Sequence, residues 1–105
     1  MMGKKKVSEV VAILKKAFPD IAGIKDASEW GTYGEDTAIH LGNAAEGGEI
    51  DGYPACDYYV EDIGEEVYVM GVHFELHRLL TKHGFYVESY DPGTYLAFRS
   101  YDGKI

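Results

Sequence analysis

Residues 85–100 read FYVESYDPGTYLAFRS, and this stretch decides the fold because it predicts a β-hairpin. Two runs rich in aromatic and β-branched residues flank Asp91-Pro92-Gly93-Thr94, where proline and glycine occupy the two central positions of a tight turn. Pairing of Tyr90 with Tyr95 across this turn would separate the side chains into two faces. The expected apolar face consists of Phe85, Val87, Leu96 and Phe98. The expected outer face carries Tyr86, Tyr90 and Tyr95.

Two segments outside the hairpin have the period of a helix. Upstream of it, apolar residues recur on one helical stripe from Val72 to His83, and Gly84 follows as a typical residue after a helix end. Near the start of the chain, residues 7–18 form a second amphipathic pattern that stops before Pro19. Each stripe needs a partner surface, and the hairpin offers one.

The stretch between these helices predicts three further strands. Apolar and polar residues alternate over 37–41, which favours a short strand. Residues 42–54 are rich in glycine and acids and are expected to form a flexible loop. The runs 56–60 and 66–70 predict a hairpin that turns near Gly64. The sequence therefore predicts one α+β domain over residues 1–105, in the order α-β-β-β-α-β-β, with two helices packed on a mostly antiparallel sheet.

Composition restricts the function classes. The chain has 105 residues, a formal net charge of −8 and a single cysteine, Cys56, which excludes an internal disulfide. No apolar run approaches the roughly 20 residues that cross a bilayer. The absence of such a run predicts no membrane partner. No phosphate-cradling or cofactor motif is present, so we expect no cofactor. Cytoplasmic localisation and no direct binding of nucleic acid are the corresponding expectations.

The charge is unevenly distributed along the chain. Residues 1–17 carry a net charge of +4, whereas residues 18–71 hold thirteen acids against Lys25 alone, a net of −12. Residues 72–105 are balanced. Such asymmetry indicates either a solvated surface that keeps the protein soluble or an acidic face that meets a basic partner.

Tyrosines accompany the acids, and tyrosine is enriched at protein interfaces. This combination favours a small acidic, non-catalytic interaction or regulatory module that binds a basic protein. One version is a nucleic-acid mimic, of the kind found in phages and mobile elements, that inhibits its target by presenting carboxylates in place of phosphates. The residues expected to bind the partner are Glu35, Asp36, Asp57, Tyr59, Glu61, Asp62, Glu65, Glu66 and Tyr68.

Two alternatives remain open. His73 and His77 are four residues apart on the expected second helix, so both imidazoles could reach one metal ion in a metal-binding protein or metal-dependent enzyme. The metalloprotease pattern is absent because Phe74 stands where a glutamate is needed, and a third ligand would have to come from elsewhere. In the other alternative the chain is a homo-oligomer subunit that pairs through Tyr86, Tyr90 and Tyr95. Cys56 is expected to be a small buried hydrophobe.

Overall fold

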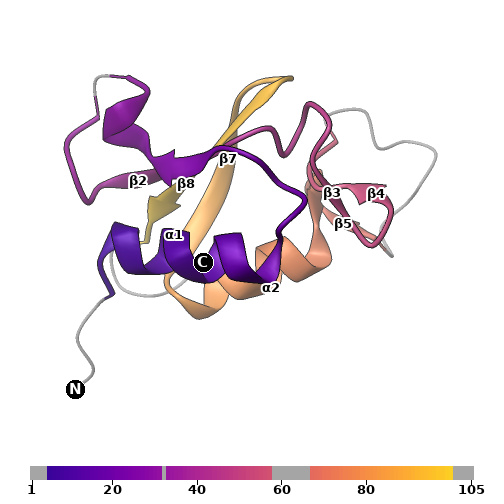
Figure 1. Cartoon of the computed structure of the whole chain (residues 1–105), viewed down its shortest axis with the longest axis horizontal. Coiled ribbons are helices and arrows are strands. Elements are labelled where there is room, and N and C mark those ends of the chain that lie inside the picture. The colour runs from indigo at the N-terminus through magenta and orange to yellow at the C-terminus, as the bar shows by residue number, and fades with distance from the viewer. Residues whose placement is uncertain (1–4, 32, 58–66, 101–105) are drawn as a thin grey trace.

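The computed structural model describes residues 5–31, 33–57 and 67–100. Two helices, α1 (Val7–Ala17) and α2 (Phe74–Lys82), pack on a four-stranded antiparallel sheet (Figure 1). In spatial order its strands are β1 (Ile24–Asp26), β2 (Ala38–Leu41), β8 (Thr94–Arg99) and β7 (Phe85–Asp91). Two short pairs complete the fold, β3 (Glu49–Ile50) with β4 (Tyr53–Pro54) and β5 (Tyr68–Val69) with β6 (Val72–His73), besides a 3-10 turn η1 (Ala27–Glu29). The α+β class predicted from the sequence is confirmed, although more short strands separate the helices than predicted.

The first helix follows its predicted bounds. Val7, Val10 and Leu14 are fully buried at helical spacing. The helix ends where the backbone N–H of Phe18 donates to the carbonyl of Leu14, one residue before Pro19.

The second helix begins two residues later than predicted. Val72 and His73 belong to β6, and the Nδ1 atom of His73 accepts a hydrogen bond of 3.1 Å from the backbone N–H of Glu75. A side chain that satisfies a first-turn N–H in this way marks the residue before a helix. At the other end Gly84 adopts a φ of +83°, as the sequence predicted for a residue after a helix end.

The terminal hairpin is confirmed, but its predicted register is wrong by one residue. Val87 pairs with Ala97 and Ser89 pairs with Tyr95, and a bulge between Ser89 and Asp91 restores the turn. A one-residue shift moves side chains to the opposite face. Tyr95 therefore lies in the core, 4% exposed, and not on the outer face with Tyr86 and Tyr90. Leu96 and Phe98 lie on the outer face instead.

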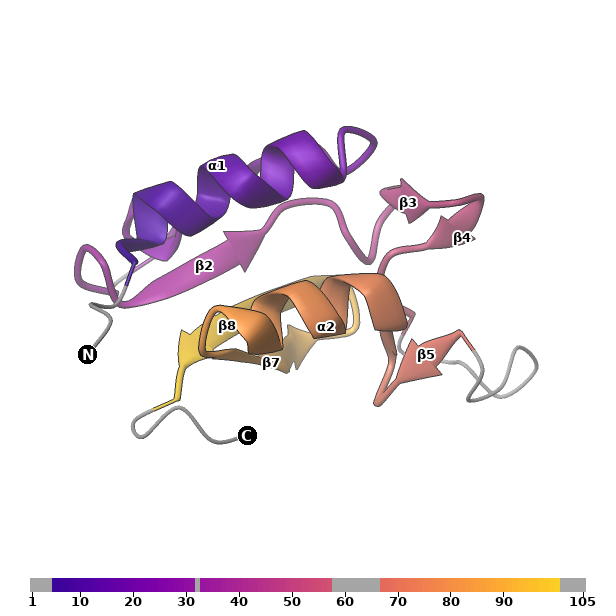
Figure 2. The ribbon, with the colours of Figure 1, turned by 90° about the horizontal axis from the view of Figure 1, so that it is seen from below.

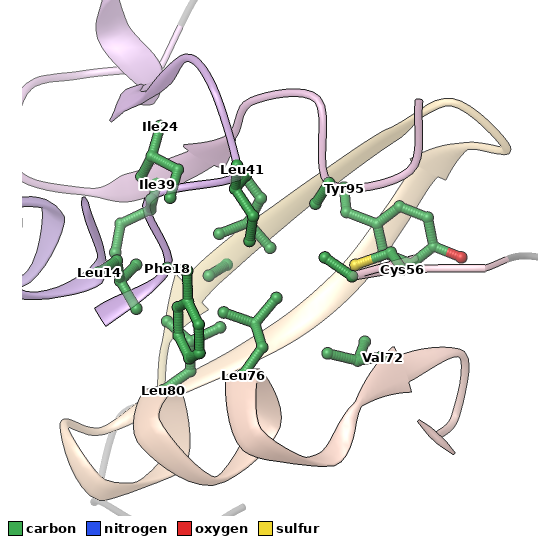
Figure 3. Close-up of a cluster of buried hydrophobic side chains, with 14 of the residues drawn as sticks. Leu14, Phe18, Ile24, Ile39, Leu41, Cys56, Val72, Leu76, Leu80 and Tyr95 are labelled. Carbon is green, nitrogen blue, oxygen red and sulfur yellow. The ribbon is translucent and has the colours of Figure 1, made fainter. Parts of the chain in front are cut away.

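The main core fills the space between the helices and one face of the sheet. Leu14 and Phe18 meet Leu76 and Leu80 over Leu41 (Figure 3). Figure 3 also shows Cys56 beside Tyr95, where the cysteine is 1% exposed, as the sequence predicted. Figure 2 views the molecule from the helix side, with α1 next to β2 and α2 over β7 and β8.

The middle of the chain departs most from its predicted structure. The strand at 37–41 is confirmed as β2, but all four of its residues are buried because it lies between β1 and β8. Residues 42–54 contain β3 and β4 and bury Ala44 and Ile50; the flexibility expected for them stays a prediction. The predicted 56–70 hairpin is wrong where it is described, since Cys56 forms a bridge with Val72 and β5 pairs with β6. Residues 58–66 lie outside the described residues.

None of the described helices is long and apolar enough to span a bilayer.

Candidate protein-binding surface

One end of the molecule is built from a segment that contains acidic residues but no lysine or arginine. Between residues 42 and 77 the chain has nine acidic residues and no lysine or arginine. We call the described part of this segment, residues 42–57 and 67–77, the acidic end. Figure 1 shows that its strands β3, β4 and β5 lie together at one end of the molecule, away from the start of α1. The side chains of Glu46, Glu49 and Asp51 are exposed there.

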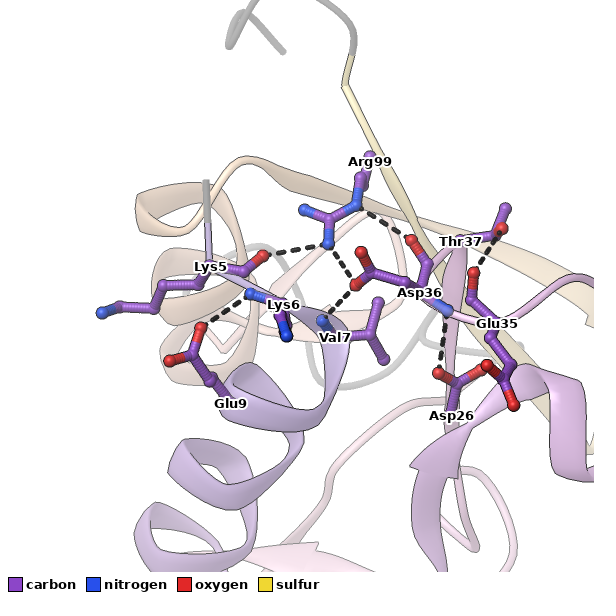
Figure 4. Close-up of polar contacts among 9 residues, drawn as sticks. All are labelled: Lys5, Lys6, Val7, Glu9, Asp26, Glu35, Asp36, Thr37 and Arg99. Atoms are coloured by element: carbon purple, nitrogen blue, oxygen red, sulfur yellow. Dashed lines mark hydrogen bonds and ion pairs between the residues drawn. The ribbon is translucent and has the colours of Figure 1, made fainter. Parts of the chain in front are cut away.

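At the opposite end two acids, Asp26 and Asp36, form hydrogen bonds within the fold. Asp36 Oδ1 accepts the backbone N–H of Val7 at 2.6 Å and a hydrogen bond from the Arg99 guanidinium at 2.7 Å (Figure 4). Arg99 also donates to the backbone carbonyls of Lys5 and Asp36, and Asp26 accepts the N–H of Asp36. We call Asp26, Asp36, Arg99 and the Val7 N–H the Asp36 network. It joins the start of α1 to the β1–β2 connection and to the end of β8.

The contacts of this network stabilise the charged carboxylates. The N–H of Val7, then the Arg99 guanidinium, hold the pKa of Asp36 below its ordinary value. Burial alone would raise the pKa of Asp26, but the backbone N–H groups of Ser28 and Asp36 outweigh it and the pKa is lowered. Asp36 thus serves the fold through these contacts, whereas no such contact involves the side chain of its exposed neighbour Glu35, and the role in partner binding expected for both residues stays a prediction.

Of the other residues predicted to bind a partner, one is half-buried, one is buried and five lie outside the described residues. Asp57 is half-buried next to the β5–β6 turn. Tyr68 is 3% exposed and its hydroxyl donates to the carbonyl of Pro54, so its prediction as a surface contact is wrong. The remaining predicted residues lie outside the described residues: Tyr59, Glu61, Asp62, Glu65 and Glu66.

A second surface covers the face of the sheet opposite the helices, and it contains Tyr86 and Tyr90 of the predicted self-association surface together with other aromatic rings that sequence reasoning did not place there. The ring of Trp30 lies 4.9 Å from that of His40 and 5.0 Å from that of Tyr90. Phe98 joins the same group through ring contacts of 5.9 Å with both Tyr33 and Tyr86. We call Trp30, Tyr33, Tyr86, Tyr90 and Phe98 the aromatic face. Trp30 and Tyr90 remain 37% and 61% exposed, so this face is covered by aromatic rings that are themselves open to contact.

His73 and His77 lie in very different surroundings. His73 is 2% exposed, accepts the N–H of Glu75 through Nδ1 and stacks on Phe74 at 5.1 Å. Burial lowers the pKa of His73, against the opposing charges of Glu75 and Asp51. His77 is half-buried on α2. Within the described ranges no three histidine, cysteine or acidic side chains gather as a metal site, and binding of a metal by this pair stays a prediction.

The Cys56 thiol is poorly suited to nucleophilic chemistry. Burial raises its pKa far above the ordinary value, which keeps the sulfur protonated.

An open groove runs between β7 and the turn that joins β5 to β6. It encloses about 500 Å³ and mixes apolar with polar residues. Its lining residues are Asp57, Met70, Gly71, Val72, Val87, Glu88, Ser89 and Tyr95. Most of these residues come from the acidic end and from β7, so the groove lies between the acidic end and β7.

Comparison of the chain with protein-family models, with curated proteins and with solved structures finds no match.

Proposed function

We propose that this protein is a non-catalytic interaction module that binds a basic protein through its acidic end. The observation that carries the proposal is the separation of charge, with nine acids and no lysine or arginine between residues 42 and 77. Exposed carboxylates of one sign attract an oppositely charged surface and speed its encounter. The version in which the carboxylates replace the phosphates of a nucleic acid belongs to the same proposal.

The exposure of Glu46, Glu49 and Asp51 supports this role, because no described ion pair neutralises them. The Asp36 network supplies the contrast. There the carboxylate is occupied by Val7 and Arg99, so it offers less to a partner. The proposal thus assigns binding to acids that the fold itself does not use.

Two triple variants of equal charge test the proposal. The first removes the acidic end in Glu46→Gln, Glu49→Gln and Asp51→Asn. The matched control removes three exposed acids elsewhere, in Asp20→Asn, Glu29→Gln and Glu35→Gln. The probe is a fluorescent deca-lysine peptide, and its affinity is measured by anisotropy at 50 and 200 mM salt.

We expect the first variant to lose about 1 kcal/mol of binding free energy, or about fivefold in affinity, and the control to lose clearly less. Affinity of the unaltered protein should fall with added salt. Equal losses in both variants, or binding that does not respond to salt, would contradict the proposal.

Self-association through the aromatic face is a second candidate. The 61% exposure of Tyr90 and the 37% exposure of Trp30 support it, because exposed aromatic clusters frequently lie in interfaces. Sedimentation of the protein and of a Tyr90→Ser variant tests it. We expect any dimer to weaken in the variant, and a protein that stays monomeric at high concentration excludes this candidate.

A further inference from the structure

Among the described strands, β7 lies at an edge of the sheet and has one unpaired side. It is the last strand in the order β1-β2-β8-β7, so only one of its sides pairs with β8. The backbone N–H of Ser100 donates to the carbonyl of Gly84 at 2.8 Å, which makes these two residues a hydrogen-bonded pair. Because bonded and non-bonded pairs alternate along an antiparallel ladder, the backbone groups of Val87 and Ser89 point away from β8. Among the described residues none bonds to these outward groups.

The groove lies alongside this open edge. Val87 and Ser89 form one wall, and Val72 and Tyr95 also line the groove, although they are almost fully buried. On the other side is Met70, which is 94% exposed. The edge therefore has space and apolar surface beside it, which an added strand needs for its side chains.

The turn that carries Met70 is held in one conformation. Met70 and Gly71 have φ values of +53° and +84°, as in the two-residue turns that join paired strands. A Cβ at Gly71 would lie 3.0 Å from the carbonyl oxygen of Asp57 and would be strained at this positive φ, so the position favours glycine. This wall of the groove is thus specified by the sequence.

We propose that an extended segment of the basic partner adds to β7 as a fifth strand of the sheet. The inference rests on the proposed function and names the way the partner is held. Side chains of an added strand alternate between the two faces of the sheet. Those on the groove side contact Val87 and Met70 and are aliphatic. Those on the other side lie next to Tyr86 and the exposed Glu88, and are lysine or arginine.

Charge favours such a partner over a second copy of this chain. Two copies paired antiparallel about the middle of β7 would place Glu88 of one copy opposite Glu88 of the other. Like charges across paired strands destabilise the pairing, whereas a lysine-bearing strand meets opposite charge at the same positions. The partner segment is therefore an extended peptide in which aliphatic and basic residues alternate.

Backbone methylation of a peptide probe tests the inference. The probe is the seven-residue peptide KVKVKVK, compared with the equally charged KKKVVVK, and binding is followed by anisotropy at 50 mM salt. Two further probes carry N-methyl groups on the valines only or on the lysines only. An added strand directs alternate N–H groups to its neighbour. We therefore expect one of the two methylated peptides to lose at least tenfold in affinity and the other to bind nearly normally.

A variant of the protein tests the edge itself. Ser89→Pro removes an N–H that points away from β8 and so keeps the hydrogen bonds between β7 and β8. Ser89→Ala keeps this N–H and serves as the control. We expect the proline variant to lose at least tenfold in affinity for KVKVKVK and the alanine variant to lose less than twofold. If the proline variant fails to fold, the comparison of the two methylated peptides is the test of strand addition.

The outcomes separate this inference from the proposed function. If both methylated peptides and KKKVVVK bind like KVKVKVK, with affinity that falls with salt, strand addition is wrong while acidic docking stands. If none of the peptides binds, or the acidic-end triple variant binds them as well as the unaltered protein, the proposed function is wrong. A dimer in sedimentation that Ser89→Pro dissociates would make a second copy the occupant and overturn the inference.

Discussion

The two ends of this molecule use the same residue type for opposite purposes. At one end Asp36 accepts the N–H of Val7 and pairs with Arg99, and Asp26 supports it, so the acids connect α1 to the sheet. At the acidic end, Glu46, Glu49 and Asp51 are exposed in a segment without lysine or arginine. The net charge of −8 therefore combines two quantities: charge used to hold the fold and charge available to a partner.

Removal of the Asp36 carboxylate should have the largest effect on stability. Asp36→Ala leaves the Val7 N–H without its acceptor and deprives Arg99, whose side chain is 19% exposed, of its ion pair. We expect a loss of about 2 kcal/mol in the free energy of unfolding. The neighbouring Glu35→Ala is the matched control and should change it by less than about 0.5 kcal/mol. Urea denaturation measures both, and equal effects would remove the distinction between the two ends.

Acidification should weaken the fold in two stages. Burial lowers the pKa of His40, helped by the charge of Lys25, and the His40 Nδ1 atom accepts the N–H of Gly42. A lowered folded-state pKa means that the unfolded chain binds the proton more readily, so stability present above about pH 6.5 is lost as the pH falls through the folded pKa. His73 contributes in the same direction.

The second stage begins near the ordinary aspartate range. The lowered pKa values of Asp26 and Asp36 contribute stability above about pH 4 that is lost as the pH falls further. Unfolding free energy measured from pH 7.5 to 3 should therefore decline below 6.5 and again below 4. In Asp36→Asn the second decline should be smaller, and an unchanged profile in that variant would contradict the role given to Asp36.

Neutralisation at the acidic end should have the smallest effect on stability. Glu49→Gln and Asp51→Asn remove charges with no described ion pair, so the free energy of unfolding should stay within about 0.5 kcal/mol of the unaltered protein. Release of repulsion among like charges makes a slight increase the expected sign. Thermal unfolding at low salt detects it. A loss above 1 kcal/mol would mean that these acids hold the fold as Asp36 does.

Local patterns in the sequence predict the elements but not their long-range contacts. The helical stripe of α1 and the turn at Pro92 and Gly93 depend on neighbouring residues, and both predictions are confirmed. The register of the last hairpin was wrong because nothing in the residues themselves signals the bulge before Asp91. That one residue decides that Tyr95 is a core residue while Tyr90 belongs to the outer surface.

The candidate site was predictable only in its charge. The uninterrupted acids between 42 and 77 can be counted in the sequence, whereas the role of Asp36 depends on Val7 and Arg99, which are 29 and 63 positions away. The aromatic face combines Trp30 with Tyr90 in the same way, and β1 is only three residues long, too short for a periodic signal. The open side of β7 follows from strand order, which no local pattern specifies.

Titration of the isotope-labelled protein with KVKVKVK, followed through its backbone amide resonances, tests the central claim most directly. We expect the shifts to concentrate in residues 42–57, 67–77 and 86–90, at the acidic end and the open side of β7. Residues of the Asp36 network should stay unchanged, and added salt should reverse the shifts. Shifts that centre on Asp36 and Arg99, or that spread evenly over the exposed acids, would contradict the division of the molecule into a structural end and a binding end.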